Sequence, residues 1–108
     1  MVVPKEILSI KISTSWKPGL TPQALYDATR RSWKLNRSRI ASIDTVLCIA
    51  ENEVKEVYCV KEWVESQDEG RVEFIGHVAP ASVRQHWMDT DVSGLLNKYG
   101  HLKYIPLD

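Results

Sequence analysis

The spacing of hydrophobic and polar residues predicts short strands separated by helices. Ile7–Ser13 is rich in β-branched residues and partly alternates, which predicts a first strand. The continuous apolar run Thr45–Ala50 is typical of a strand that is buried on both faces. After a short polar turn, Val54–Val64 predicts the returning strand of a hairpin, and the alternation in Val72–Gly76 predicts a third strand of the same meander.

Two helices and a closing strand complete the prediction. Thr21-Pro22 places a threonine at an N-cap and a proline in the first turn, so a helix begins there and is expected to run to about Trp33. A second helix is expected over Pro80–Met88, and Leu102–Ile105 predicts the last strand. The positions of the first helix that follow the i, i+3, i+4 rule and should face the core are Leu25, Ala28, Thr29, Ser32 and Trp33.

The order β-α-β-β-β-α-β predicts an α+β fold in one domain over residues 1–108. Five short strands with two helices suit a strongly curved or barrel-like five-stranded sheet, antiparallel or mixed. The alternation slips near Val57-Tyr58, which predicts a bulge there. A chain of 108 residues is long enough to bury a core without a disulfide or a metal, and we expect no cofactor.

Charge is balanced in total and unevenly distributed. The chain has 14 Lys and Arg against 14 Asp and Glu, yet residues 1–39 carry a net charge of +6 and residues 40–73 a net charge of −6. A dipolar surface could orient toward a polyanion, although the acidic half weighs against strong nonspecific binding of nucleic acid. No apolar run approaches the roughly 20 residues of a membrane span. The absence of a secretory leader and of a disulfide framework predicts a cytoplasmic protein.

Residues 25–39 combine aromatic side chains with five cations. On a helix, Arg30, Trp33, Lys34 and Arg37 share one face, so the indole could stack on an unpaired base while the cations contact phosphates; such stacking contributes roughly 1–3 kcal/mol per base. In the alternative, Trp33 anchors the core and the cations form a solvated face. Arg30 would then be a buried ion-pair partner of Glu56 or Glu73.

The other aromatic and metal-ligating residues give weaker signals. Trp16, Trp63 and Trp87 fall near predicted element ends, where they could line a base pocket or cap the open end of a barrel. Cys48 and Cys59 lie with His77 on three consecutive predicted strands, but no close-spaced Cys or His pair exists and structural zinc usually takes four ligands. No nucleophile, phosphate-loop or metal-ligand motif occurs, so we predict no metal and no catalytic activity.

One segment resembles a known family. Leu25–Arg30 followed by Trp33 is similar to the L-Y-E-A-T-R-x-x-W segment of a small uncharacterised prokaryotic domain, and the similarity continues through Val46–Ile49, Val54–Tyr58 and Arg71–Gly76. It covers most of residues 7–80 and weakens toward the C-terminus. By analogy at the level of the fold, the resemblance implies a PUA-like barrel, a class whose members bind RNA or modified bases in a cleft.

Together these observations predict a non-catalytic binding domain that engages nucleic acid, either RNA or DNA, including a flipped or modified base. The alternative is a protein-interaction module or homodimer that uses exposed tryptophans and the two opposed charge blocks. The residues predicted to bind nucleic acid are Arg30, Trp33, Lys34, Arg37, Arg39, Trp16 and Trp63.

Overall fold

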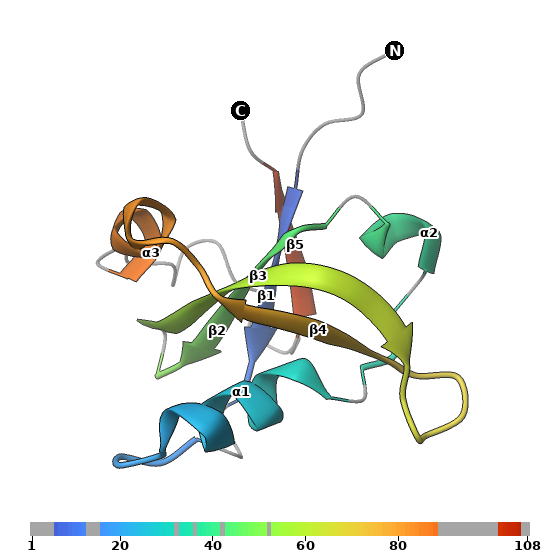
Figure 1. Ribbon diagram of the computed structural model, residues 1–108, viewed down its shortest axis with the longest axis horizontal. Helices are drawn as coiled ribbons and strands as arrows, with labels where there is room; N and C mark the ends of the chain where they lie inside the picture. The colour runs from blue at the N-terminus through green and yellow to red at the C-terminus, as the bar shows by residue number, and fades with distance from the viewer. Residues whose placement is uncertain are drawn as a thin grey trace.

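A mixed β-sheet forms the centre of the molecule (Figure 1). Its strands are β1 (Glu6–Lys11), β2 (Thr45–Ala50), β3 (Glu53–Glu65), β4 (Val72–Val78) and β5 (Leu102–Pro106). They lie in the order β4-β3-β2-β1-β5. The pair β1–β2 is parallel, and the other neighbouring pairs are antiparallel.

The computed structural model describes residues 6–12, 16–31, 33–35, 37–41, 43–51, 53–88 and 102–106. For Glu6, Arg37, Arg39 and residues 102–106, only the backbone is described. The described side-chain packing of the sheet is therefore that of strands β1 to β4. Strand β5 is placed by its backbone pairing with β1.

The prediction of a strongly curved or barrel-like five-stranded sheet with two helices is wrong. The sheet is open, because β4 and β5 stand at opposite ends of the strand order and do not pair with each other. A barrel would need the outer edge of β4 for closure, and the backbone of Trp33 already occupies part of that edge through a bridge to Val72. The chain also forms an additional short helix that the predicted order lacks.

Helix α1 (Pro22–Arg30) begins as predicted and ends early. The hydroxyl of Thr21 accepts a hydrogen bond from the Ala24 amide at 3.1 Å, which is the expected N-cap. Arg31 is extended, so the helix stops three residues before Trp33, whose backbone pairs with a strand instead. The chain then forms the short α2 (Arg37–Ile40) before it enters the sheet.

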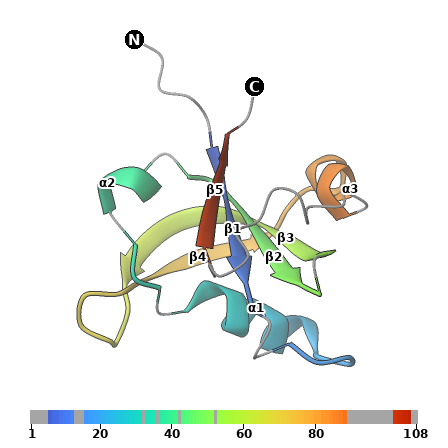
Figure 2. The same cartoon turned by 180° about the vertical axis from the view of Figure 1, so that it is seen from behind.

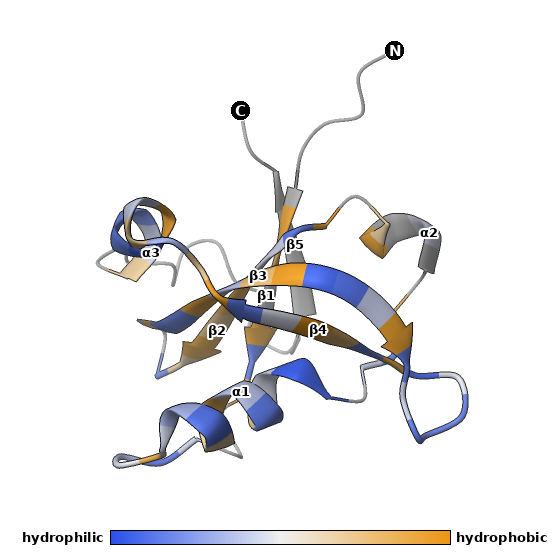
Figure 3. Cartoon of the chain, viewed as in Figure 1, coloured by the Kyte–Doolittle hydropathy of each residue, from blue (hydrophilic) through white to orange (hydrophobic). Residues whose placement is uncertain are grey.

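The two larger helices pack on opposite faces of the sheet, and Figure 2 shows the arrangement from behind. Helix α1 covers the face that contains Leu8, Ile10 and Phe74. Helix α3 (Ala81–Met88) covers the face that contains Leu47 and Val57. Strand β2, between them, is apolar along most of its length, whereas the turn between β3 and β4 is hydrophilic (Figure 3). Half-buried Leu25 and Ala28 and buried Thr29 confirm that part of the predicted helix face. Trp33 packs on the same side of the sheet but lies beyond the end of α1, and Ser32 lies outside the described residues.

Strand β3 is irregular at two points. Its register shifts opposite Cys48 and Ile49, and again between Val60 and Glu62, so the predicted bulge near Val57-Tyr58 is misplaced by a few residues. The second shift brings the backbone of Cys59 against Gly76, where an added Cβ would lie 2.0 Å from the Cys59 carbonyl oxygen. Position 76 therefore admits only glycine.

Among the described residues, none of the helices has the length and apolar run that crossing a bilayer requires.

Candidate ligand-binding cleft

The outer edge of β4 is covered by α1 and the residues that follow it. The Gly76 amide donates to the Tyr26 hydroxyl at 2.9 Å, and the Arg30 Nε donates to the Phe74 carbonyl at 3.1 Å. Val72 exchanges two backbone hydrogen bonds with Trp33, at 2.8 and 2.9 Å. Positions 72, 74 and 76 are those whose backbone groups point away from β3, so the L-Y-x-A-T-R-x-x-W segment acts as a cap on this strand edge.

Arg30 is committed to this cap. Its Nη2 lies 2.6 Å from a Glu73 carboxylate oxygen, and the two side chains are only 18% and 15% exposed. The guanidinium carbon also lies 5.6 Å from the centroid of the Tyr26 ring. Such a pair confirms the alternative that placed Arg30 in an ion pair with Glu73, and it leaves the guanidinium poorly placed to bind a phosphate.

Trp33 is likewise engaged in the fold. Its indole N–H donates to the Thr29 carbonyl at 2.7 Å, which satisfies one of the free carbonyls at the end of α1. The ring packs against the α1-side core, in agreement with the core-anchor alternative. Thr29 itself is fully buried, and its hydroxyl donates to the Leu25 carbonyl at 2.8 Å.

The remaining predicted residues lie in separate places. Trp16 packs at the edge of the α1-side core, with the Lys55 ammonium 4.4 Å from its ring centroid. Lys34 is exposed. Arg37 and Arg39 belong to α2, but their side chains lie outside the described residues. The structure thus does not gather the predicted set at one surface. It does bring one member, Trp63, to α2.

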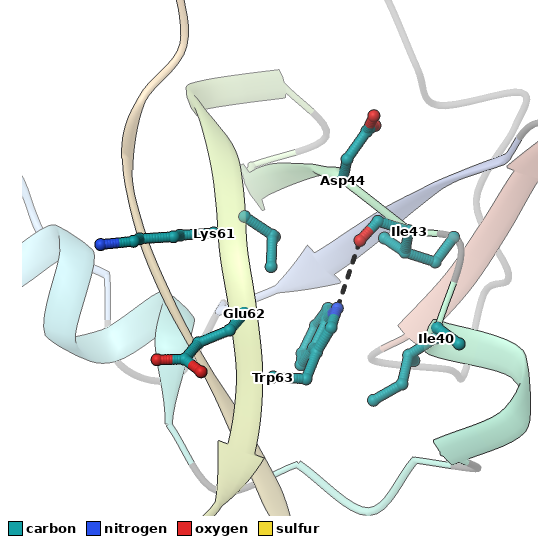
Figure 4. Close-up of a pocket in the computed structure, with 8 residues that line it drawn as sticks. Ile40, Ile43, Asp44, Lys61, Glu62 and Trp63 are labelled. Carbon is teal, nitrogen blue, oxygen red and sulfur yellow. Dashed lines mark hydrogen bonds between the residues drawn. The ribbon is translucent and has the colours of Figure 1, made fainter.

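A cleft of about 550 Å³ lies between α2 and the second half of β3 (Figure 4). Buried Ile40 and Ile43 form its apolar floor together with half-buried Trp63. The Trp63 indole N–H donates to the Ile43 carbonyl at 3.2 Å, and the ring meets Phe74 edge-to-face with centroids 5.6 Å apart. The other lining residues are Ala41, Asp44, Val60, Lys61 and Glu62.

The rim of this cleft is polar and partly made of backbone. Asp44, Lys61 and Glu62 are exposed. In Figure 4 the side chains of Lys61 and Glu62 point to the opposite side of β3 from Trp63, so the main chain of the strand faces the cleft at these residues. An apolar floor with a few polar groups at the rim, in a cavity of this size, is the usual composition of a ligand site in a protein.

Burial shifts the pKa of two titratable groups in the described core, Cys48 and Tyr58. Burial raises the pKa of the Cys48 thiol to about 11, and burial likewise raises the pKa of Tyr58 well above its ordinary value. Both groups are therefore protonated at neutral pH. A cysteine that acts as a nucleophile needs the opposite shift, a lowered pKa. In the described part of the chain, no group of three or more His, Cys, Asp or Glu side chains is placed to hold a metal ion.

Comparison with models of protein families, with curated proteins and with solved structures finds no match to this chain.

Sequence reasoning did not identify the cleft as a unit. Ile40, Ile43 and Asp44 carry no motif, and Trp63 drew attention only as one tryptophan of four. A signal was nevertheless available, because the predicted strand at 54–64 is much longer than its predicted partner at 45–50. A long strand beside a short one must leave part of its edge without that partner.

Proposed function

We propose that this chain is a non-catalytic binding domain that recognises another protein through the cleft between α2 and β3. The observation that supports the proposal is the apolar floor of Ile40, Ile43 and Trp63, in a cleft that the main chain of β3 also lines at Lys61 and Glu62 (Figure 4). A half-buried tryptophan in an apolar pocket with a polar surround is typical of the residues that dominate protein interfaces.

Selection from a displayed library of random dodecapeptides tests this proposal. Ala41 is exposed at the rim, so Ala41→Trp should fill the mouth of the cleft. The matched control is Ala81→Trp, because Ala81 is exposed at the start of α3 on the other side of the sheet. We expect selected peptides to bind the wild type and the control and to lose at least tenfold in affinity for Ala41→Trp. The proposal would be contradicted if no peptides are selected, or if the selected peptides bind Ala41→Trp as tightly as the wild type.

Nucleic acid is the second candidate ligand, and one observation favours it. The half-buried indole of Trp63 lines the cleft, and exposed Lys61 lies on the same strand two residues earlier. Titration with single-stranded RNA and DNA at low salt tests this alternative. If it holds, Lys61→Ala lowers both the affinity and its salt dependence, whereas Lys17→Ala, at an exposed turn away from the cleft residues, changes neither. No binding at tens of micromolar would contradict it, because nonspecific contacts alone usually reach that range.

The cytoplasmic location and the relation to the L-Y-E-A-T-R-x-x-W domain also stay proposals. Both cysteines are free, and they pack on opposite faces of the sheet, with Cys48 beneath α1 and Cys59 beneath α3. Such an arrangement does not lend itself to a disulfide within the chain, which supports a reducing compartment.

A further inference from the structure

Strand β3 continues well beyond the end of its neighbour β2. The pairing of the two strands ends at Thr45 opposite Cys59, and the last hydrogen bond between them runs from the Val60 amide to the Asp44 carbonyl at 2.8 Å. From Val60 to Glu65, β3 still pairs with β4 on its other side. Within the part of the chain that the structure describes, the edge that faces α2 therefore has no strand beside it beyond Val60.

The backbone groups on this edge follow from the pairing with β4. In an antiparallel pair, residues opposite each other either bond to one another or both point outward. The Phe74 carbonyl and the Val72 amide and carbonyl point outward, since they bond to Arg30 and Trp33. On β3, Trp63 is paired with Phe74 and Glu65 is paired with Val72. The N–H and C=O groups of Trp63 and Glu65 consequently point away from β4, toward the α2 side.

Each of these two residues lies at a cavity. Trp63 lines the cleft of about 550 Å³ described above, and Glu65 lines a second cavity of about 420 Å³ that Leu35 also lines. The open edge thus presents donors and acceptors two residues apart, with an apolar floor beside the first. This is the arrangement that an added strand recognises, with its main chain bonded to the edge and alternate side chains entering pockets.

We propose that the partner is an extended peptide segment that adds to the open edge of β3 as a further strand, and this inference rests on the proposed function. The apolar floor of Ile40, Ile43 and Trp63 would receive an apolar side chain of the peptide. On the opposite side of β3, exposed Glu62 favours a lysine or arginine across from it, because oppositely charged cross-strand neighbours attract. The matching peptide therefore alternates apolar and basic residues.

A slim peptide suits this edge better than the other two classes of partner. A second copy of the chain would have to bring its own α2 to the cleft together with its own β3. A nucleic-acid strand lacks the regular amide donors and acceptors that match Trp63 and Glu65, and it would bring its phosphates close to Asp44 and Glu62.

The experiment uses an acetylated heptapeptide of alternating lysine and valine, titrated into the full chain by calorimetry. Glu65→Pro removes the amide that faces the cavity, and Glu65→Ala is the matched control that keeps this amide. We expect binding to the wild type, a loss of at least tenfold for Glu65→Pro and for Ala41→Trp, and a change below threefold for Glu65→Ala. A peptide with valine alternating with glutamate should bind at least fivefold more weakly.

Amide hydrogen exchange gives an answer that does not depend on the folding of Glu65→Pro. In the wild type, saturating peptide should slow exchange at the Trp63 and Glu65 amides at least tenfold. Strand addition would be overturned if Ala41→Trp abolishes binding, Glu65→Pro binds as tightly as the wild type, and exchange at the two amides does not change. The cleft would then remain a protein-binding site. Absence of heptapeptide binding would also overturn strand addition, and the library selection would then decide the proposed function on its own. If RNA rather than peptide binds in an Ala41-dependent way, both proposals fail.

Discussion

The two edges of the β3–β4 hairpin differ in how their backbone groups are satisfied. On the β4 side, Tyr26, Arg30 and Trp33 bond to three successive outward-pointing positions. On the β3 side, the two outward-pointing positions Trp63 and Glu65 face cavities. Among the described residues, α1 and Trp33 thus close one edge, whereas no strand covers the other. An exposed strand edge can pair with another chain, so an uncovered edge beside a cleft indicates a binding site.

The comparison changes how the basic-aromatic segment is understood. Its clustering of arginine, tyrosine and tryptophan looks like a surface for nucleic acid when only the sequence is considered. In the structure, three of its side chains supply donors or acceptors to the fold, and Arg30 is neutralised by Glu73. A segment whose sequence resembles a nucleic-acid-binding surface can thus owe its pattern to a structural role.

The largest expected effect comes from Gly76→Ala, which adds a side chain to β4 where this strand lies closest to the backbone of β3. The new Cβ would collide with the Cys59 carbonyl, so β3 and β4 could not keep their register. We expect a loss of about 4 kcal/mol or more in the free energy of unfolding, or failure to fold. The control is Gly70→Ala, where φ is +78° and nothing lies within 4 Å; it should cost about 1–2 kcal/mol in urea denaturation. Equal losses in the two variants would refute the close approach.

Arg30→Ala tests whether the cap depends on its ion pair. The substitution removes the bond to Phe74 and leaves the mostly buried Glu73 carboxylate without its cation, so we expect a loss of about 2–4 kcal/mol. Neighbouring Arg31 is exposed, and Arg31→Ala should change stability by less than about 0.5 kcal/mol. If Arg30→Ala folds as stably as the wild type and instead loses nucleic-acid binding, the original prediction for this residue is restored.

Alkaline pH probes the core beneath the capping helix. The pKa of Cys48 rises from 9.0 to about 11 on folding, so its contribution to stability is complete below pH 9 and is lost as the pH rises through 11. A shift of this size corresponds to a loss of about 2–3 kcal/mol, and buried Tyr58 adds a loss of the same sign at higher pH. Denaturation of the wild type and of Cys48→Ala between pH 8 and 11 should show a shallower decline for the variant. Parallel declines would show that Cys48 is accessible to water.

Tyr26→Phe is the mildest change to the cap. It removes only the hydroxyl that accepts from the Gly76 amide and keeps the ring contacts with Tyr58 and Phe74. We expect a loss of about 1 kcal/mol and faster exchange of the Gly76 amide. An unchanged exchange rate would indicate that water replaces the hydroxyl. The edge of β4 would then be open to solvent at Gly76, and the two edges of the hairpin would differ less than we infer.

Local patterns predicted much of the secondary structure because they depend on neighbouring residues. The N-cap at Thr21, the apolar run of β2 and the turn before β4 are all decided within a few positions. The openness of the sheet was not predictable in this way. Part of the outer edge of β4 is taken by Trp33, which pairs with Val72 across 39 positions, and no periodicity in either segment encodes that bridge.

The candidate site shows the same limit. Arg30 was correctly considered as a partner of Glu73, since a cation on a core-facing helix needs an acid nearby. The cleft, in contrast, arises from the difference in length between β2 and β3 and from the place where α2 lies, and both are properties of the assembled sheet. Its apolar floor is made of isoleucines that look like ordinary core residues in the sequence.

The pairing of β1 with β5 has a consequence for synthesis on the ribosome. Glu6 is opposite Pro106, so β1 is flanked by a strand that is synthesised roughly 100 residues after it. At about 5–20 residues per second, roughly 5–20 seconds separate the two strands. Over that interval one side of β1 lacks its partner in the nascent chain, even when the hairpin of β3 and β4 is already made. Completion of the described sheet therefore waits for the synthesis of β5, and until then this edge of β1 can pair with other chains.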